Sequence, residues 1–100
     1  MKTVFKYGET LVTIYKGYNY INDFWVNPMY RGKGYGKRLA TYLPYICWLM
    51  SCPYDKDKNS LNRKQLLMFY RKLGFKFYKD KYNRDIGFRG FKPTKEILMT

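Results

Sequence analysis

The stretch from Val26 to Leu39 constrains the fold of this chain more than any other segment. An apolar, β-branched and aromatic run over 20–26 predicts a strand, and Pro28 ends its pairing. A glycine-rich turn follows, and the sequence from Tyr35 favours a helix. Such an order forms an anion site, because glycines let the backbone approach the ligand and the free N–H groups of the helix start point at it. The segment therefore predicts a ligand that carries phosphate.

Three common patterns fit this glycine turn incompletely. A dinucleotide fingerprint requires a third Gly where Lys37 stands, and a Walker A loop requires Ser or Thr where Arg38 stands. The RNA-binding RNP1 pattern matches residues 33–36. It then requires a strand of the form F-V-x-F/Y, whereas residues 37–40 favour helix, so only half of that motif is present.

A fourth pattern, R/Q-x-x-G-x-G/A, is filled at every position by Arg31-Gly32-Lys33-Gly34-Tyr35-Gly36, and Val26-x-Pro28 precedes it. A second segment, Phe69-Tyr70-Arg71-Lys72-Leu73-Gly74-Phe75, resembles the helix-to-strand form F/L-Y-x-K-L-G-F. Both patterns, in this order, are typical of the GNAT superfamily of acyl-CoA-dependent N-acyltransferases. The chain resembles a short GNAT member over about residues 3–92.

The resemblance implies a reaction and a role for each matching residue. Acetyl-CoA would be the cosubstrate, the loop would wrap its pyrophosphate, and the backbone N–H near Val26 would polarise the thioester carbonyl at a bulge in the strand. Tyr70 corresponds to the acid that protonates the departing thiolate. The resemblance does not identify the general base, for which Asp23 and Tyr20, both in the strand over 20–26, are the candidates. The residues expected to bind the cofactor are Trp25, Val26, Arg31, Gly32, Lys33, Gly34, Tyr35, Gly36, Lys37 and Arg63. Arg63 stands where the family often has Asn.

The expected fold is a single α+β domain over 1–100 with the order β-β-β-α-β-α-β-β. The patterns predict strands over 3–7, 11–15, 20–26, 46–52, 75–78 and 86–91, although 46–52 alone does not separate strand from helix. A hairpin turn is expected at Gly8-Glu9. A helix is expected from Tyr35, with apolar positions to Ile46 and a break or kink at Pro44. A second helix is expected from Ser60 or Asn62 to Gly74. The resemblance implies a mostly antiparallel GNAT-like sheet with two main helices. Members of the family usually have another strand and two helices before this hairpin, and those helices commonly form one wall of the cleft that binds the acceptor. The resemblance begins after them, so a second copy of the chain is a candidate for that wall.

The charge balance, 20 Lys and Arg against 7 Asp and Glu, predicts anionic partners. Coenzyme A phosphates account for only part of this excess, so nucleic acid or an acidic protein stays open as a partner, and the acceptor amine is not identified. Aromatic residues alternate with cations over 75–79 and 88–92. The alternative hypothesis is therefore a non-enzymatic, basic nucleic-acid-binding or host-interaction protein on a GNAT-like or RRM-like scaffold.

The chain has no histidine, which excludes a Cys/His zinc site and His-based triads, and no metal is predicted. Cys47 and Cys52 are expected to be free, buried thiols in a reducing compartment. The uncharged run over 39–54 is too short to span a membrane, and the N-terminus lacks the apolar stretch of a signal peptide. These features predict a soluble cytoplasmic protein.

Overall fold

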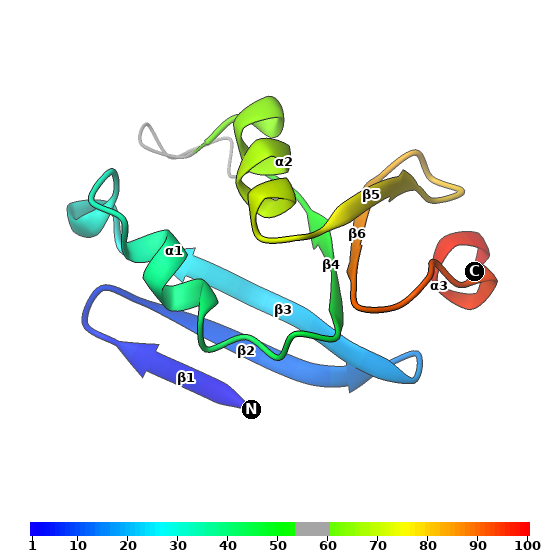
Figure 1. The fold of residues 1–100 in the computed structure, drawn as a ribbon, viewed down its shortest axis with the longest axis horizontal. Helices are drawn as coiled ribbons and strands as arrows, with labels where there is room; N and C mark the ends of the chain where they lie inside the picture. Colours follow the sequence, from blue (N-terminus) through cyan, green and yellow to red (C-terminus); the bar gives the residue numbers. More distant parts are fainter. Residues whose placement is uncertain (54–60) are drawn as a thin grey trace.

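The computed structural model describes residues 1–53 and 61–100, and within them one mixed sheet carries all the strands (Figure 1). The strand order is β1-β2-β3-β4-β6-β5, and every neighbouring pair is antiparallel except β3 and β4. The strands are β1 Lys2–Phe5, β2 Gly8–Tyr15, β3 Tyr18–Val26, β4 Cys47–Ser51, β5 Lys76–Lys79 and β6 Asp85–Arg89. The helices are η1 Pro28–Tyr30, α1 Tyr35–Ala40, α2 Arg63–Lys72 and α3 Lys95–Met99. The predicted α+β class and mostly antiparallel sheet are confirmed.

The first hairpin turns at residues 6–7, and the turn predicted at Gly8-Glu9 is wrong. Gly8 already belongs to β2, where it pairs with Phe5 on one side and Val26 on the other. A Cβ on Gly8 would lie 2.3 Å from the carbonyl oxygen of Trp25. This glycine therefore serves close packing of β2 against the end of β3 rather than a turn.

The first helix ends at Ala40, four residues before Pro44, where the sequence predicts a break or kink, and so it is shorter than the apolar spacing to Ile46 indicates. In the segment between α1 and β4, the guanidinium of the buried Arg89 donates hydrogen bonds to two carbonyl oxygens, Tyr45 O at 2.8 Å and Pro44 O at 3.0 Å. The same side chain donates to Leu73 O at the end of α2, at 2.9 Å. These bonds satisfy carbonyl groups that lie beyond the ends of the two helices.

The second helix has the boundaries that its local signals predict. Asn62 and Gln65 form a capping box, and Ser60 lies outside the described residues. At the other end Gly74 has a φ of +100°, the left-handed conformation that commonly follows a helix. The short helix α3 is not among the predicted elements. Thr94 caps its start, and its buried residue Ile97 packs in the same cluster as Trp48 of β4.

The two faces of the sheet have separate hydrophobic cores. One core lies under α1 and α2 and contains Tyr70 and Phe75, while the other lies against α3 and contains Trp48 and Phe88. Cys47 is buried as expected, whereas Cys52 is exposed; both are free thiols. In the described part of the chain, no helix is both long enough and apolar enough to cross a membrane.

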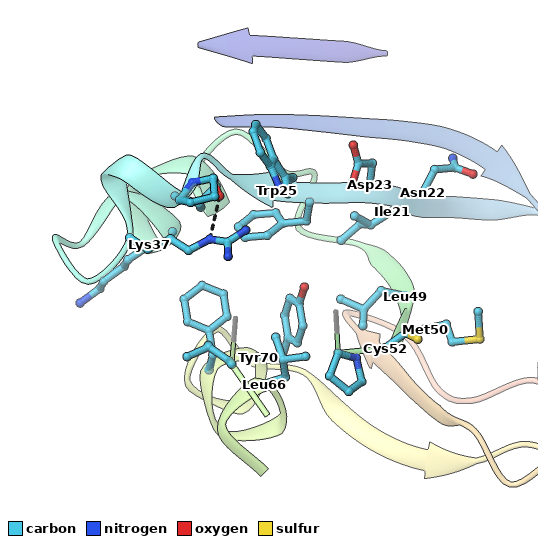
Figure 2. A pocket seen from close by; sticks show the side chains of 18 of the residues that line it. Ile21, Asn22, Asp23, Trp25, Lys37, Leu49, Met50, Cys52, Leu66 and Tyr70 are labelled. Carbon is cyan, nitrogen blue, oxygen red and sulfur yellow. Dashed lines mark hydrogen bonds between the residues drawn. The ribbon is translucent and has the colours of Figure 1, made fainter. Parts of the chain in front are cut away.

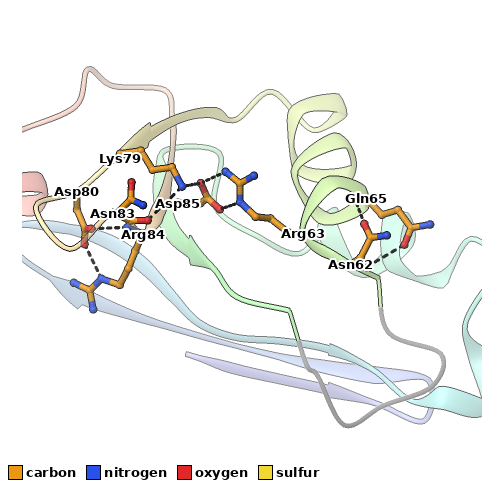
Figure 3. Close-up of polar contacts among 8 residues, drawn as sticks. All are labelled: Asn62, Arg63, Gln65, Lys79, Asp80, Asn83, Arg84 and Asp85. Carbon is orange, nitrogen blue, oxygen red and sulfur yellow. Dashed lines mark hydrogen bonds and ion pairs between the residues drawn. The ribbon is translucent and has the colours of Figure 1, made fainter.

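Asp85 links β6 to the start of α2 and to β5 (Figure 3). Arg63 binds its carboxylate with two hydrogen bonds of 2.6 and 2.8 Å, and Lys79 Nζ lies 2.9 Å from it. The bonds from Arg63, with a further contribution from Lys79, lower the pKa of Asp85 from 3.8 to about 2 although burial opposes the change. The ionised carboxylate therefore stabilises the folded state above the ordinary pKa, and that contribution is lost as the pH falls towards 2.

We predict that Asp85→Asn removes this pH-dependent part of the stability. The variant should have a lower free energy of unfolding than the parent at neutral pH, and the two should converge between about pH 4 and pH 2. Chemical denaturation at a series of pH values measures the difference. Glu9→Gln, which removes a carboxylate 3.7 Å from Lys2, is the matched control and should keep the parent's slope. A parallel offset between Asp85→Asn and the parent at all pH values would contradict the assignment.

Candidate active site

A cavity of about 730 Å³ opens where β3 and β4 separate (Figure 2). The two strands pair at a single register position, Tyr20 with Trp48, and then diverge. Side chains from both faces of β3 line the gap, as do Leu49 and Met50 of β4. The cavity therefore extends through the sheet, with α2 and the glycine turn on one side.

A bulge in β3 accompanies the divergence, but not at its predicted place near Val26. Leu11 pairs with Asp23 and Val12 with Ile21, so Asn22 is the extra residue. The register from there to Val26 is regular. Because a bulge bends its strand and increases the local twist, Asn22 turns β3 away from β4 immediately after their single paired position.

The end of β3 presents backbone polar groups to the gap. Asn27 donates its N–H to Tyr7 O on the β2 side, and the carbonyl oxygen of Val26 accepts a 2.8 Å hydrogen bond from Arg31 Nε on the other side. In an antiparallel strand, the N–H and C=O of one residue point towards the same neighbouring strand, and those of the next residue point to the opposite edge. The N–H of Val26 therefore points away from β2, along the edge that borders the cavity.

The glycine turn forms one end of the cavity. Gly32 and Gly34 have φ values of +77° and +84°, and a Cβ on Gly36 would lie 3.3 Å from the ring of Phe69. Backbone can thus approach a ligand here without side chains in between. The cavity-lining residues of this turn are Arg31, Gly32, Gly34, Gly36 and Lys37.

Two residues of the predicted set point elsewhere within the turn. Lys33 Nζ lies 3.4 Å from Met29 O, and the ring of Tyr35 packs against those of Tyr7 and Tyr30 at 4.7 and 5.3 Å. Neither side chain lines the cavity.

Tyr70 lies on the opposite wall, on α2. Its ring is packed by Phe24, Phe69 and Phe75 at centroid distances of 6.2, 5.4 and 5.8 Å, and only 8% of the residue is exposed. Its hydroxyl points across the cavity towards β3 (Figure 2). The same tyrosine thus contributes to the core and presents one polar atom to the cavity.

The predicted side chains of Asp23, Trp25 and Arg63 have different surroundings. Asp23 lines the cavity, but its carboxylate leaves β3 on the side opposite to Tyr70, as does Trp25 (Figure 2). Arg63 is not brought to the cavity, because its guanidinium binds Asp85. Within residues 1–53 and 61–100 there is no cluster of three or more His, Cys, Asp or Glu side chains that could hold a metal ion.

Several apolar cavity residues were missing from the predicted set. They come from β4, the segment after it and α2: Leu49, Met50, Cys52, Pro53, Leu61 and Leu66. In sequence they look like ordinary core residues, and they line a cavity only because β3 and β4 separate. No local pattern could have identified them.

A family model described as an acetyltransferase (GNAT) domain matches residues 3–77. The chain belongs to the GNAT family. The matched region of this GNAT domain contains the diverging strands, the glycine turn and Tyr70. Comparisons with curated proteins and with solved structures returned no match.

The left-handed conformation of Gly34 leads to a stability prediction for the GNAT loop. A Cβ at Gly34 meets no atom within 4 Å, so substitution is strained by backbone conformation alone. Gly34→Ala should lower the free energy of unfolding by about 1 kcal/mol. Gly34→Asn should lose less, because Asn tolerates this left-handed conformation better than Ala does. Urea denaturation of the three proteins tests the order, and an alanine variant as stable as the parent would refute it.

Proposed function

We propose that this GNAT domain transfers an acetyl group from acetyl-CoA to a primary amine by direct attack. The observation that carries the proposal is the cavity between β3 and β4, with the glycine turn at one end and Tyr70 on the opposite wall. Its volume of about 730 Å³ falls within the range of about 300–1,000 Å³ typical of small-ligand sites.

In this proposal the glycine turn binds the pyrophosphate of coenzyme A. The backbone N–H groups of residues 32–36 would donate to phosphate oxygens, and Lys37, which lines the cavity, would add a positive charge. The side chain of Arg31 has a supporting part, because its bond to Val26 O ties the turn to the end of β3. The pantetheine arm would then lie along the edge of β3.

The chemistry follows from what lies beside that edge. The neutral amine nitrogen attacks the thioester carbon, and the N–H of Val26 stabilises the oxyanion that forms. The C–S bond then breaks with the electron pair on sulfur, and the thiolate takes a proton from the Tyr70 hydroxyl. Asp23 is the proposed base: because its carboxylate lies on the other side of β3, it takes the proton lost by the attacking nitrogen through water. The Tyr70 phenolate then regains a proton from solvent.

We predict that a carboxylate in the glycine turn weakens the binding of acetyl-CoA. Gly34→Asp and Gly36→Asp should each weaken the affinity measured by calorimetry by more than about tenfold, since they put negative charge beside the phosphates. Gly17→Asp is the matched control: Gly17 also has a left-handed φ, of +87°, and open space, but it lies in the β2–β3 turn. Affinity retained by both loop variants would refute the assignment of the loop.

We predict that Tyr70→Phe lowers the acetylation rate by about 10²–10⁴-fold while leaving the affinity for acetyl-CoA unchanged. Only the hydroxyl is removed, so the packing against Phe24 and Phe75 should persist. Release of coenzyme A thiol, with whichever amine the parent protein acetylates fastest, measures the effect. Tyr7→Phe, a buried tyrosine outside the cavity, is the control. An unchanged rate in Tyr70→Phe would assign Tyr70 to the core alone.

A further inference from the structure

The β5–β6 hairpin combines exposed aromatic rings with positive charge. From Lys76 to Arg84 it carries four cations and one acid, Asp80. Tyr78 is 40% exposed and Tyr82 is 62% exposed. Large exposed rings among cations are the arrangement with which proteins bind single-stranded nucleic acid, because bases stack on the rings while cations contact phosphates.

The turn of this hairpin is held in one conformation by Asp80 (Figure 3). Its carboxylate accepts the N–H groups of Tyr82 and Arg84 at 3.0 and 2.8 Å, and Arg84 Nε at 2.7 Å. The guanidinium of Arg84 and Nζ of Lys81 lie 4.8 and 4.9 Å from the centre of the Tyr82 ring. The exposed ring is thus presented on an ordered turn with two cations beside it.

The acids of this region are neutralised within the protein. Asp80 binds Arg84, and Asp85 binds both Arg63 and Lys79. In the described part of the chain, no carboxylate lies within ion-pair distance of Lys76 or Lys81. The remaining charge of the hairpin is therefore available to an anionic partner.

The hairpin leads across the sheet to the cavity. Tyr78 pairs with Ile86 and Ile86 with Met50, so the three side chains form a row on the α3 face, and Met50 lines the cavity. Tyr20 also lines the cavity on this face, where its ring packs against Trp48 at 4.4 Å. This side of the cavity lies across the sheet from α2 and Gly36.

We propose that a single-stranded nucleic acid docks along this hairpin and presents the acceptor amine to the cavity. The acceptor part rests on the proposed function, whereas docking can be measured by itself. Phosphates would contact Lys76 and Lys81, and bases would stack on Tyr78 and Tyr82. The exposed rings favour nucleic acid over an acidic peptide, which needs only the cations.

This surface includes Lys76 and Tyr78 of the stacking segment that the sequence predicts over 75–79, but no residue of the segment predicted over 88–92. In the segments 75–79 and 88–92, Phe75 and Phe88 are each only 2% exposed, and Arg89 is buried between carbonyl groups. Phe91 stacks on Tyr18 at 3.9 Å. An RRM-like platform over these strands is therefore absent, and exposed rings remain at the outer strand and the turn.

The test is fluorescence anisotropy with a labelled 12-nucleotide single-stranded RNA over a range of salt concentrations. Lys81→Glu combined with Tyr82→Ala should weaken binding more than about tenfold and reduce the salt dependence. Lys6→Glu combined with Tyr45→Ala, a matched change at an exposed lysine and an exposed tyrosine outside the hairpin, should stay within about twofold of the parent. Circular dichroism checks that both variants are folded.

The anisotropy measurement is repeated with saturating acetyl-CoA. An RNA docked on the hairpin should stay bound when acetyl-CoA occupies the glycine turn. Displacement of the RNA by acetyl-CoA, equal effects of the two double variants, or equal binding of a poly-glutamate peptide would each overturn the proposal. If acetyl-CoA fails to bind the parent protein while the RNA binds through the hairpin, the proposed function fails and the docking surface stands.

Discussion

The separation of β3 from β4 is the constraint on which the site depends. The strands are joined at Tyr20 and Trp48, whose rings lie 4.4 Å apart, and Trp48 Nε1 donates to Tyr15 O at 3.2 Å. Farther along, β3 packs against the helix α2 instead of β4: the ring of Phe24 lies 6.0 Å from that of Phe69. β3 is thus paired with β4 at one end and packs against α2 at the other. Its backbone groups between these points face a cavity instead of a neighbouring strand.

That geometry requires α2 to stay in place, and β6 holds it at both ends. Asp85, the first residue of β6, binds Arg63 at the start of the helix, and Arg89, the last, binds Leu73 O just beyond its end. Both contacts involve charged groups with good geometry in partly buried surroundings, where hydrogen bonds are stronger than at the surface. Tyr70 is therefore positioned by a strand that does not itself line the cavity.

What the sequence predicts well is local. The capping box at Asn62, the glycine that ends α2 and the glycine turn each depend on residues a few positions apart, and all three are found as expected. The roles of Arg63 and Arg89 depend on partners 22 and 45 residues away, so the sequence suggests only a cofactor-binding and a surface cation. The bulge at Asn22 and the apolar cavity wall depend in the same way on how three strands meet.

Arginine and lysine have different roles in this chain, and the difference explains how it folds with a formal charge of +13. Each arginine contacts a specific partner: Arg31, Arg63, Arg84 and Arg89 bind carbonyl or carboxylate oxygens, and Arg38 and Arg71 lie over aromatic rings. The planar guanidinium suits such contacts, whereas the more strongly hydrated lysine ammonium favours solvent. The excess charge presented to a partner is thus carried mainly by lysines. Lysine substitutions should therefore report on binding, and arginine substitutions mainly on folding.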